Sequence, residues 1–264
     1  MLNDITLGQY YPAKSILHRC DPRIKLILTF VYLIVIFLIK SYAGFAILLA
    51  FTVLAVIVSD VPVRYVLKGL KPVVFIVVLT LIVNIFFTNG GTTVLKLAFI
   101  RITDQGIDNA LRLAIKLILL IVSASLLTLT TTPILLTDGL EKLMSPLKKI
   151  GFPAHEIAMM MTIALRFIPT LLEEMDKIIK AQSSRGADFN SGGLLARAKS
   201  YVPVLVPLFV SAFRRADELA TAMEARCYRG GHGRTRMRQL KFTGADLIVS
   251  LVTFSFMAIL LIIQ

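Results

Sequence analysis

The stretch LAIKLILLIVSASLLTL, Leu113–Leu129, carries one charged residue, Lys116, among apolar, small and hydroxyl-bearing side chains. A transmembrane helix needs about 17–25 predominantly apolar residues, and this stretch reaches that length. The rest of the chain has the same character, because 56% of its 264 residues are hydrophobic and the mean hydropathy is +0.79, whereas soluble domains are about 45–50% apolar. We therefore predict an all-α integral membrane protein.

Four more apolar runs predict about five crossings in total. The first and third of these runs are short for a crossing, and Lys25 and Lys40 lengthen the first by reaching into the two headgroup layers. The runs are Leu26–Ile39, Ala43–Val58, Pro72–Phe87 and Leu247–Ile263.

Lysine and arginine set the predicted orientation, because cytoplasmic loops are enriched in them. Four basic residues precede the first span, whereas Lys40 alone lies between the first two spans. Residues 138–241 hold 17 basic and ten acidic residues. We therefore expect a multi-pass protein of the plasma membrane with a cytoplasmic N-terminus. The net charge of +13 is assigned to these cytoplasmic segments rather than to a nucleic-acid partner.

Residues 131–242, between the last two spans, are predicted to lie outside the hydrocarbon although they are partly apolar. Their apolar segments Ile157–Leu165 and Tyr201–Phe213 are too short to cross. Arg166 interrupts the first and Arg214 ends the second, and an arginine at mid-bilayer costs about 2.5–3.5 kcal/mol. We expect helices that lie along the inner membrane face or against protein.

The insert is predicted to form two long kinked helices. The first begins near Pro153, where a missing N–H is harmless, and continues to Arg185 with a kink at Pro169. The second is predicted over Leu194–Tyr228, kinked at its two prolines. The predicted organisation is a cytoplasmic segment at 1–25, four membrane helices in 26–130, the cytoplasmic domain at 131–242 and a fifth membrane helix in 243–264.

Two segments of this insert end alike, AQSSRGADF (Ala181–Phe189) and AMEARCYRG (Ala222–Gly230). Together with an aspartate five residues before its alanine, each follows the pattern D-x4-A-x3-R. Alanine and arginine in this pattern share one helical face, so a partner can approach beside the cation. Glycine after the first arginine is a natural helix stop, whereas the cysteine after the second is a poor one. The matched residues are Asp176, Ala181 and Arg185 in the first and Asp217, Ala222 and Arg226 in the second.

Two interpretations of these arginines are open. Each arginine stabilises a helix C-terminus by about 0.3–1 kcal/mol through the helix dipole. Alternatively, the planar guanidinium docks into a carboxylate or carbonyl cluster in the groove of a partner. Repetition on two long apolar helices favours docking.

The chain resembles the transmembrane T components of energy-coupling factor (ECF) transporters, the CbiQ-like family. That family ends its cytoplasmic coupling helices in two Ala-Arg-Gly-type motifs, whose places are taken here by SRG and ARC, with Ser184 for alanine and Cys227 for glycine. The likeness covers nearly the whole chain. Other segments that carry it are GQYYPAKSILHRCDPRIKL (Gly8–Leu26), RFIPTLLEEM (Arg166–Met175) and EARCYRGG (Glu224–Gly231).

The resemblance implies a non-catalytic subunit of an ATP-binding-cassette (ABC) importer for a vitamin or a transition metal. In such importers each motif docks on one of two cytoplasmic ATPases, which are identical or different, and a membrane-embedded S component captures the substrate and rests on the coupling helices. Closure of the ATPases on ATP moves these helices. The docking residues that the resemblance implies are Ala181, Ser184, Arg185, Gly186, Ala222, Ala225, Arg226 and Cys227.

No catalytic, cofactor or metal site is predicted. The sequence has no G-x4-G-K-[ST] phosphate-binding loop, and its three histidines are scattered without metal-ligand spacing. Cys20 and Cys227 lie on basic, cytoplasmic segments, which indicates reduced thiols.

The main alternative is a self-sufficient secondary carrier, which should show inverted repeats among its spans and broken helices with polar groups at mid-membrane. The repeat found here lies in the insert instead. A membrane enzyme is disfavoured because no cluster of titratable residues is evident, and a basic nucleic-acid-binding anchor is a poorer fit.

Overall fold

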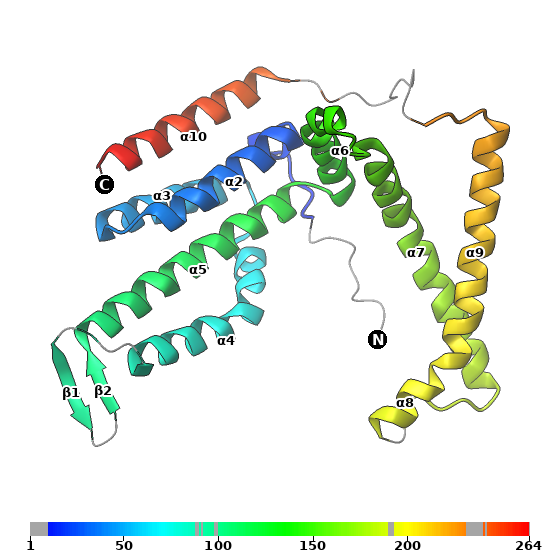
Figure 1. The fold of residues 1–264 in the computed structure, drawn as a ribbon, viewed down its shortest axis with the longest axis horizontal. Coiled ribbons are helices and arrows are strands. Elements are labelled where there is room, and N and C mark those ends of the chain that lie inside the picture. The colour runs from blue at the N-terminus through cyan, green and yellow to red at the C-terminus, as the bar shows by residue number, and fades with distance from the viewer. Residues whose placement is uncertain are drawn as a thin grey trace. The chain divides into compact units, whose positions relative to one another are not determined.

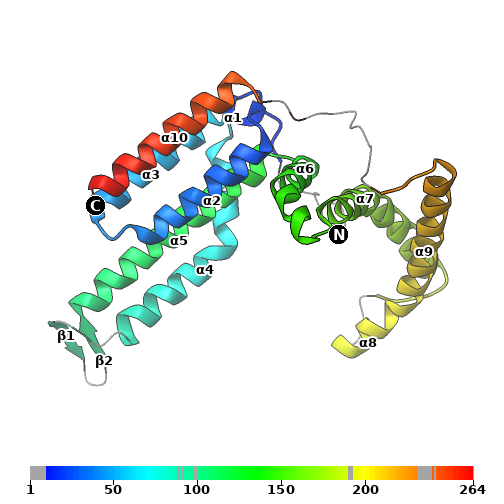
Figure 2. The same ribbon diagram turned by 45° about the horizontal axis from the view of Figure 1, so that its top comes forward.

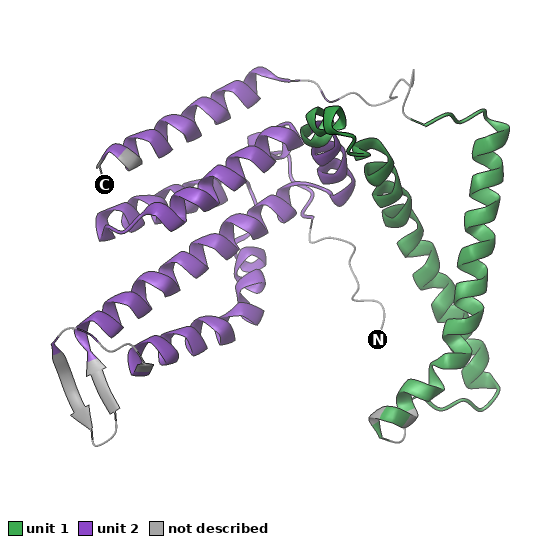
Figure 3. Ribbon diagram, in the orientation of Figure 1, with its two compact units in different colours: residues 1–7, 143–238 green, residues 8–142, 239–264 purple. Residues whose placement is uncertain are grey.

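The structure is a computed structural model, and it describes residues 10–87, 90, 92–97, 100–189, 193–230, 240 and 242–263. The first nine residues of the predicted N-terminal segment lie outside this set. The chain divides into two compact units (Figure 3). Residues 8–142 and 239–264 form the unit called here the bundle unit, and residues 143–238 form the unit called the rod unit.

All five predicted spans lie in helices of the bundle unit. Its central helix is α5 (Asp104–Thr130), which packs against α2, α3 and α4 (Figure 1, Figure 2). Asp21 and Pro22 start α2 as an N-cap and first-turn proline, with the Asp21 carboxylate accepting from Arg23 N at 2.9 Å. The other helices are α1 (Ile16–Arg19), α2 (Pro22–Leu38), α3 (Tyr42–Val58), α4 (Val63–Phe87), α6 (Pro133–Met144) and α10 (Gly244–Ile263).

The helix that contains the third predicted span begins earlier than the apolar run. The sequence was expected to start it at Pro72, but α4 begins at Val63 and continues through that proline. An interior proline removes one backbone hydrogen bond, and membrane helices tolerate this because neighbouring groups re-satisfy the freed carbonyl. The run that looked short is therefore part of a helix of 25 residues.

A two-stranded antiparallel hairpin interrupts the helical pattern between α4 and α5. Strand β1 (Thr93–Leu97) pairs with β2 (Ile100–Thr103). The hairpin was not predicted, although its threonine, valine and isoleucine residues favour strands. Apart from it, the regular structure of the described residues is helical, as the sequence predicted.

By length and hydropathy, three of the described helices are able to span a membrane, namely α4, α5 and α7 (Ala154–Ser184), while α3 and α10 are shorter apolar helices. Length and composition therefore do not separate α7 from the spans. Arg166 argues against a crossing by α7, because its side chain is exposed near the middle of this helix and would face lipid there. That position would cost about 2.5–3.5 kcal/mol.

The rod unit contains η1 (Ser145–Ile150), α7, α8 (Leu194–Ser200) and α9 (Val202–Ala225). The bounds of the first predicted rod are confirmed, because α7 follows Pro153, contains Pro169 and is capped by Arg185. The second was wrong as a single helix, since the chain breaks at Tyr201 between α8 and α9. Pro203 explains the break, because a proline fits the first turn of a new helix and cannot donate within a continuing one.

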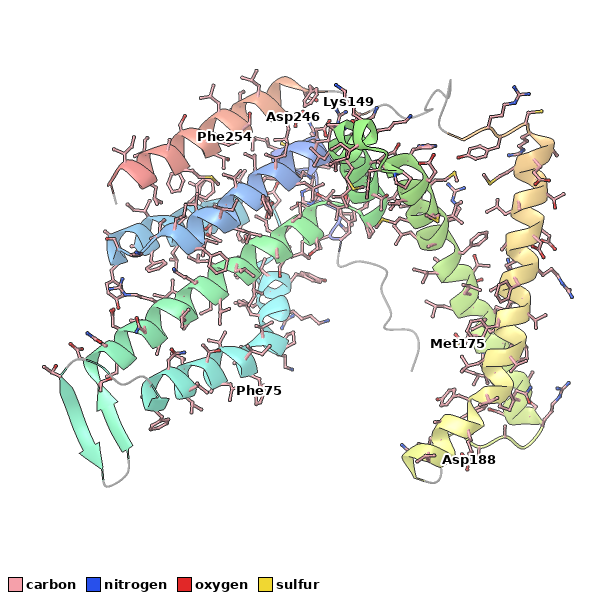
Figure 4. The ribbon with its side chains drawn as sticks, viewed as in Figure 1. Phe75, Lys149, Met175, Asp188, Asp246 and Phe254 are labelled. Carbon is pink, nitrogen blue, oxygen red and sulfur yellow. The ribbon has the colours of Figure 1, made fainter. Side chains whose placement is uncertain are left out.

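A buried aspartate ties α10 to the start of α2. Asp246 is 1% exposed and accepts hydrogen bonds from Asp21 N at 2.6 Å and Thr243 N at 2.7 Å (Figure 4). Arg23 adds a second link, with its Nη2 donating to Leu240 O at 3.1 Å and its guanidinium lying 4.9 Å from the Phe242 ring centroid. The last membrane helix is thus fixed to the first by a polar junction.

Changing Asp246→Ala should destabilise the bundle unit, because two backbone N–H groups lose their acceptor and each unsatisfied group costs about 1–3 kcal/mol. We expect a clear fall in the melting temperature of the detergent-solubilised protein. Asp217→Ala, which removes an exposed carboxylate, serves as the control and should leave the melting temperature unchanged. Equal melting temperatures for both variants would contradict the role given to this junction.

Candidate functional site

Helices α7 and α9 run antiparallel within the rod unit, and three contacts establish this. Gln182 Nε2 donates to Pro203 O at 3.4 Å, which places the end of α7 beside the start of α9. The Tyr228 hydroxyl lies 3.1 Å from Met159 Sδ, which places the end of α9 beside the start of α7. Between these ends, Glu174 accepts from the Ser211 hydroxyl and pairs with Arg215 at 3.2 Å.

The predicted docking residues of the first tip close α7 with a left-handed turn. Arg185 is the C-cap and Gly186 follows with φ of 89°. Gly186 N donates to Ser183 O at 3.0 Å, and Ala187 N donates to Gln182 O at 3.0 Å. These two bonds form a Schellman motif, which satisfies carbonyls that the helix end would leave open.

The second tip repeats this geometry without a glycine. Arg226 is the C-cap of α9, and Cys227 adopts φ of 54°. Cys227 N donates to Glu224 O at 2.8 Å, and Tyr228 N donates to Met223 O at 3.0 Å. The left-handed conformation costs a non-glycine residue about 1–2 kcal/mol. The cap is thus the same although the sequence made Cys227 a poor helix stop.

All eight predicted docking residues are exposed on the rod unit. In each tip the alanine lies one helical turn before the arginine on the same face, as the i,i+4 spacing predicted. Neither Arg185 nor Arg226 forms an ion pair with another described residue. The exposed set is Ala181, Ser184, Arg185, Gly186, Ala222, Ala225, Arg226 and Cys227.

The structure does not bring the two tips together. Because the helices are antiparallel, Arg185 lies near the start of α9 and Arg226 at its end. Helix α9 has 24 residues, so its ends are about 36 Å apart at 1.5 Å per residue. The tips therefore present two separate cationic ends with similar backbone geometry, and one small groove cannot hold both.

An apolar groove of about 250 Å³ lies between the two rods and was not predicted. Phe167 and Leu171 of α7 line one side, and Leu219 and Met223 of α9 line the other. The crossing contact of Glu174 with Arg215 was also missed, because it joins residues 41 positions apart that only the packing of α7 on α9 brings close. Among the described residues, no group of three or more His, Cys, Asp or Glu is arranged to hold a metal ion.

Comparison with known proteins places this chain in a family. A family model described as CbiQ, cobalt transport protein, matches residues 13–237. Proteins named energy-coupling factor transporter transmembrane protein EcfT are similar over nearly their whole length. The chain is 61% identical to that of Ruminiclostridium cellulolyticum (100% of this chain, 98% of the relative), 54% to that of Clostridium kluyveri (95% and 93%) and 48% to that of Bacillus subtilis (97% and 97%).

A bundle of apolar helices, joined to exposed helical rods and matched by these relatives, defines a multi-pass membrane protein of a transport system. The chain belongs to the CbiQ family, and over nearly its whole length it is similar to the energy-coupling factor transmembrane proteins above. The family resemblance stated from the sequence is therefore confirmed.

The two cysteines are both free and should differ sharply in reactivity. Cys227 is exposed at the second tip, whereas Cys20 is 4% exposed, and burial beside Asp246 raises the pKa of its thiol to about 11. Because the thiolate is the reactive form, a neutral, buried thiol reacts slowly at neutral pH. We expect a maleimide to label the folded protein once, at Cys227.

Mass spectrometry of the labelled protein checks this expectation. Cys227→Ser should abolish labelling of the folded protein, and a second label should appear on the wild-type chain after denaturation or as the pH rises toward the pKa of Cys20. Rapid labelling of Cys20 in the folded Cys227→Ser protein at neutral pH would contradict the burial of this thiol.

Proposed function

We propose that the chain is the non-catalytic energy-coupling subunit of an ATP-driven importer, with its rod unit in the cytoplasm. Arg185 and Arg226 each dock into one of two cytoplasmic ABC ATPases. The observation that carries this proposal is the repetition of one exposed, arginine-bearing cap at the two opposite ends of the α7–α9 pair. Two ends about 36 Å apart suit two separate subunits better than one.

The chemistry of each tip supports docking rather than helix capping alone. A dipole contribution of about 0.3–1 kcal/mol requires only a cation near the helix end. It does not require an exposed alanine one turn earlier or, at the second tip, the left-handed conformation of the non-glycine residue Cys227. A guanidinium presents fixed donors to carboxylates and carbonyls, so an exposed tip with a small neighbour suits a groove lined by such groups.

An exposed apolar face on α9 supports a membrane-embedded partner, the substrate-binding S component. Exposed apolar patches of this kind mark protein or membrane contacts. No charged residue occurs between 202 and 213. The exposed side chains are Val202, Leu205, Val206, Phe209, Val210 and Phe213.

Motion is then transmitted mechanically. ATP-driven closure of the ATPases draws the two tips together, and the rods, held at their crossing by Glu174, Ser211 and Arg215, pass the displacement to the S component. The S component tilts and releases its vitamin or transition-metal cargo inward. The chain itself performs no chemistry in this scheme, and its N-terminus lies in the cytoplasm.

Reversing the charge of both tips should separate the chain from its ATPases. Loss of a buried, hydrogen-bonded charge at an interface costs about 2–5 kcal/mol, so each of Arg185→Glu and Arg226→Glu should weaken one docking contact about 30-fold or more. The double variant should reach the membrane and fail to co-purify with ATPases. The matched control is Arg214→Glu, which changes an exposed arginine within α9, the helix that Arg226 caps.

If the two ATPases differ, each single variant should lose one of them and keep the other. Quantitative mass spectrometry of the complex purified in mild detergent gives this readout. Wild-type recovery of both ATPases with the double variant would contradict docking at the tips.

The chain reconstituted alone should move no substrate, because energy and substrate recognition reside in its partners. Proteoliposomes that contain only this chain should accumulate neither radiolabelled vitamins nor cobalt ions, with or without ATP. Uptake by the lone chain above that of empty liposomes would favour the secondary carrier.

A further inference from the structure

A short segment at the start of the rod unit combines exposed apolar and basic side chains. Residues 145–153, with the sequence SPLKKIGFP, are all exposed and include no acidic residue. Ile150 is 83% exposed, Leu147 44% and Phe152 38%. Lys148 and Lys149 lie between the apolar positions, and Figure 4 shows Lys149 on this segment.

The backbone sorts these side chains onto different faces. Residues i and i+3 of a 3₁₀-helix eclipse each other, so Leu147 and Ile150 of η1 share one face and the two lysines flank it. Gly151 then turns the chain with φ of 85°, and Phe152 N donates to Leu147 O at 3.3 Å. Phe152 is thereby held at the same end of the segment as Leu147.

Aliphatic and aromatic side chains flanked by lysines suit the boundary between lipid headgroups and acyl chains. The apolar side chains enter the hydrocarbon edge, while the ammonium groups reach phosphates on flexible stems. The segment also lies close in sequence to a membrane span, because α5 ends at Thr130 and η1 begins at Ser145. The exposed face of α9 differs, since it has no lysine or arginine between 202 and 213.

We infer that residues 145–153 form an interfacial anchor that binds anionic phospholipid at the cytoplasmic face of the membrane. Leu147, Ile150 and Phe152 insert, and Lys148 and Lys149 select anionic headgroups. The anchor holds the N-terminal start of the rod unit at the bilayer surface. It does not depend on docking of the ATPases, because it concerns the chain and lipid alone.

The chain contains no tryptophan, so the fluorescence of a single introduced tryptophan is measured without a contribution from other tryptophans. Ile150→Trp replaces an exposed apolar residue, and Glu218→Trp, at an exposed position beside Asp217, is the water-facing control. In lipid nanodiscs that contain only this chain, Ile150→Trp should emit at shorter wavelength than the control. It should also be quenched less by acrylamide and more by phospholipids brominated on their acyl chains.

Selectivity is measured with nanodiscs in which a minor lipid is brominated, either phosphatidylglycerol or phosphatidylcholine at the same mole fraction. Brominated phosphatidylglycerol should quench the Ile150→Trp protein more strongly. Adding Lys148→Ser and Lys149→Ser should remove this preference. We expect each lysine to contribute about fivefold to the relative affinity for the anionic lipid, because an anionic leaflet attracts basic residues near its surface.

Three results would overturn the inference. The first is water-like emission and full acrylamide quenching of Ile150→Trp in nanodiscs. The second is equal quenching by the two brominated lipids with no effect of the lysine changes. The third is a shift in emission that occurs only after partner subunits are added, which would assign the segment to a protein contact.

Discussion

The free-energy cost of placing a guanidinium in hydrocarbon distinguishes α7 from the membrane-spanning helices in this account. Helices α4, α5 and α7 are all long and apolar enough to cross a membrane, but α7 carries exposed Arg166 near its middle. A penalty of about 2.5–3.5 kcal/mol for that one residue favours a helix at the membrane surface. If α7 crossed the bilayer, its tip and that of α9 would lie on opposite sides of the membrane, because the two helices are antiparallel. The docking proposal therefore depends on this penalty.

In the proposed function the rods lie outside the hydrocarbon, and the ends of helices α7 and α9 are the docking sites. A helix end leaves backbone carbonyls without hydrogen-bond donors. A left-handed residue turns the chain back, so that N–H groups at and after this residue donate to these carbonyls. Arg185 and Arg226 both occupy the position just before that turn, so each side chain projects from a fixed backbone. A fixed base lowers the entropy lost when a partner binds the guanidinium, which favours the docking proposed for these tips.

Much of this structure was predictable because it depends on local sequence. Apolar runs predicted the five long apolar helices of the bundle unit, α2, α3, α4, α5 and α10. Prolines were the main source of local error. Pro72 was taken as a helix start although α4 continues through it, and the kink predicted at Pro203 is a full break at Tyr201, because this proline lies in the first turn of a new helix.

The remainder depends on residues far apart in the chain. Asp246 bonds to Asp21 N across 225 positions, and Glu174 meets Arg215 only where α7 crosses α9. The turn at Cys227 shows context overriding propensity, because the repeated cap persists despite a residue that disfavours it. A cryo-electron microscopy structure of the assembled transporter tests the central claim most directly. We predict that Arg185 and Arg226 are each buried in a groove of a different ATPase, with both left-handed turns intact. Tips that face solvent, or an α7 that crosses the bilayer, would contradict the account.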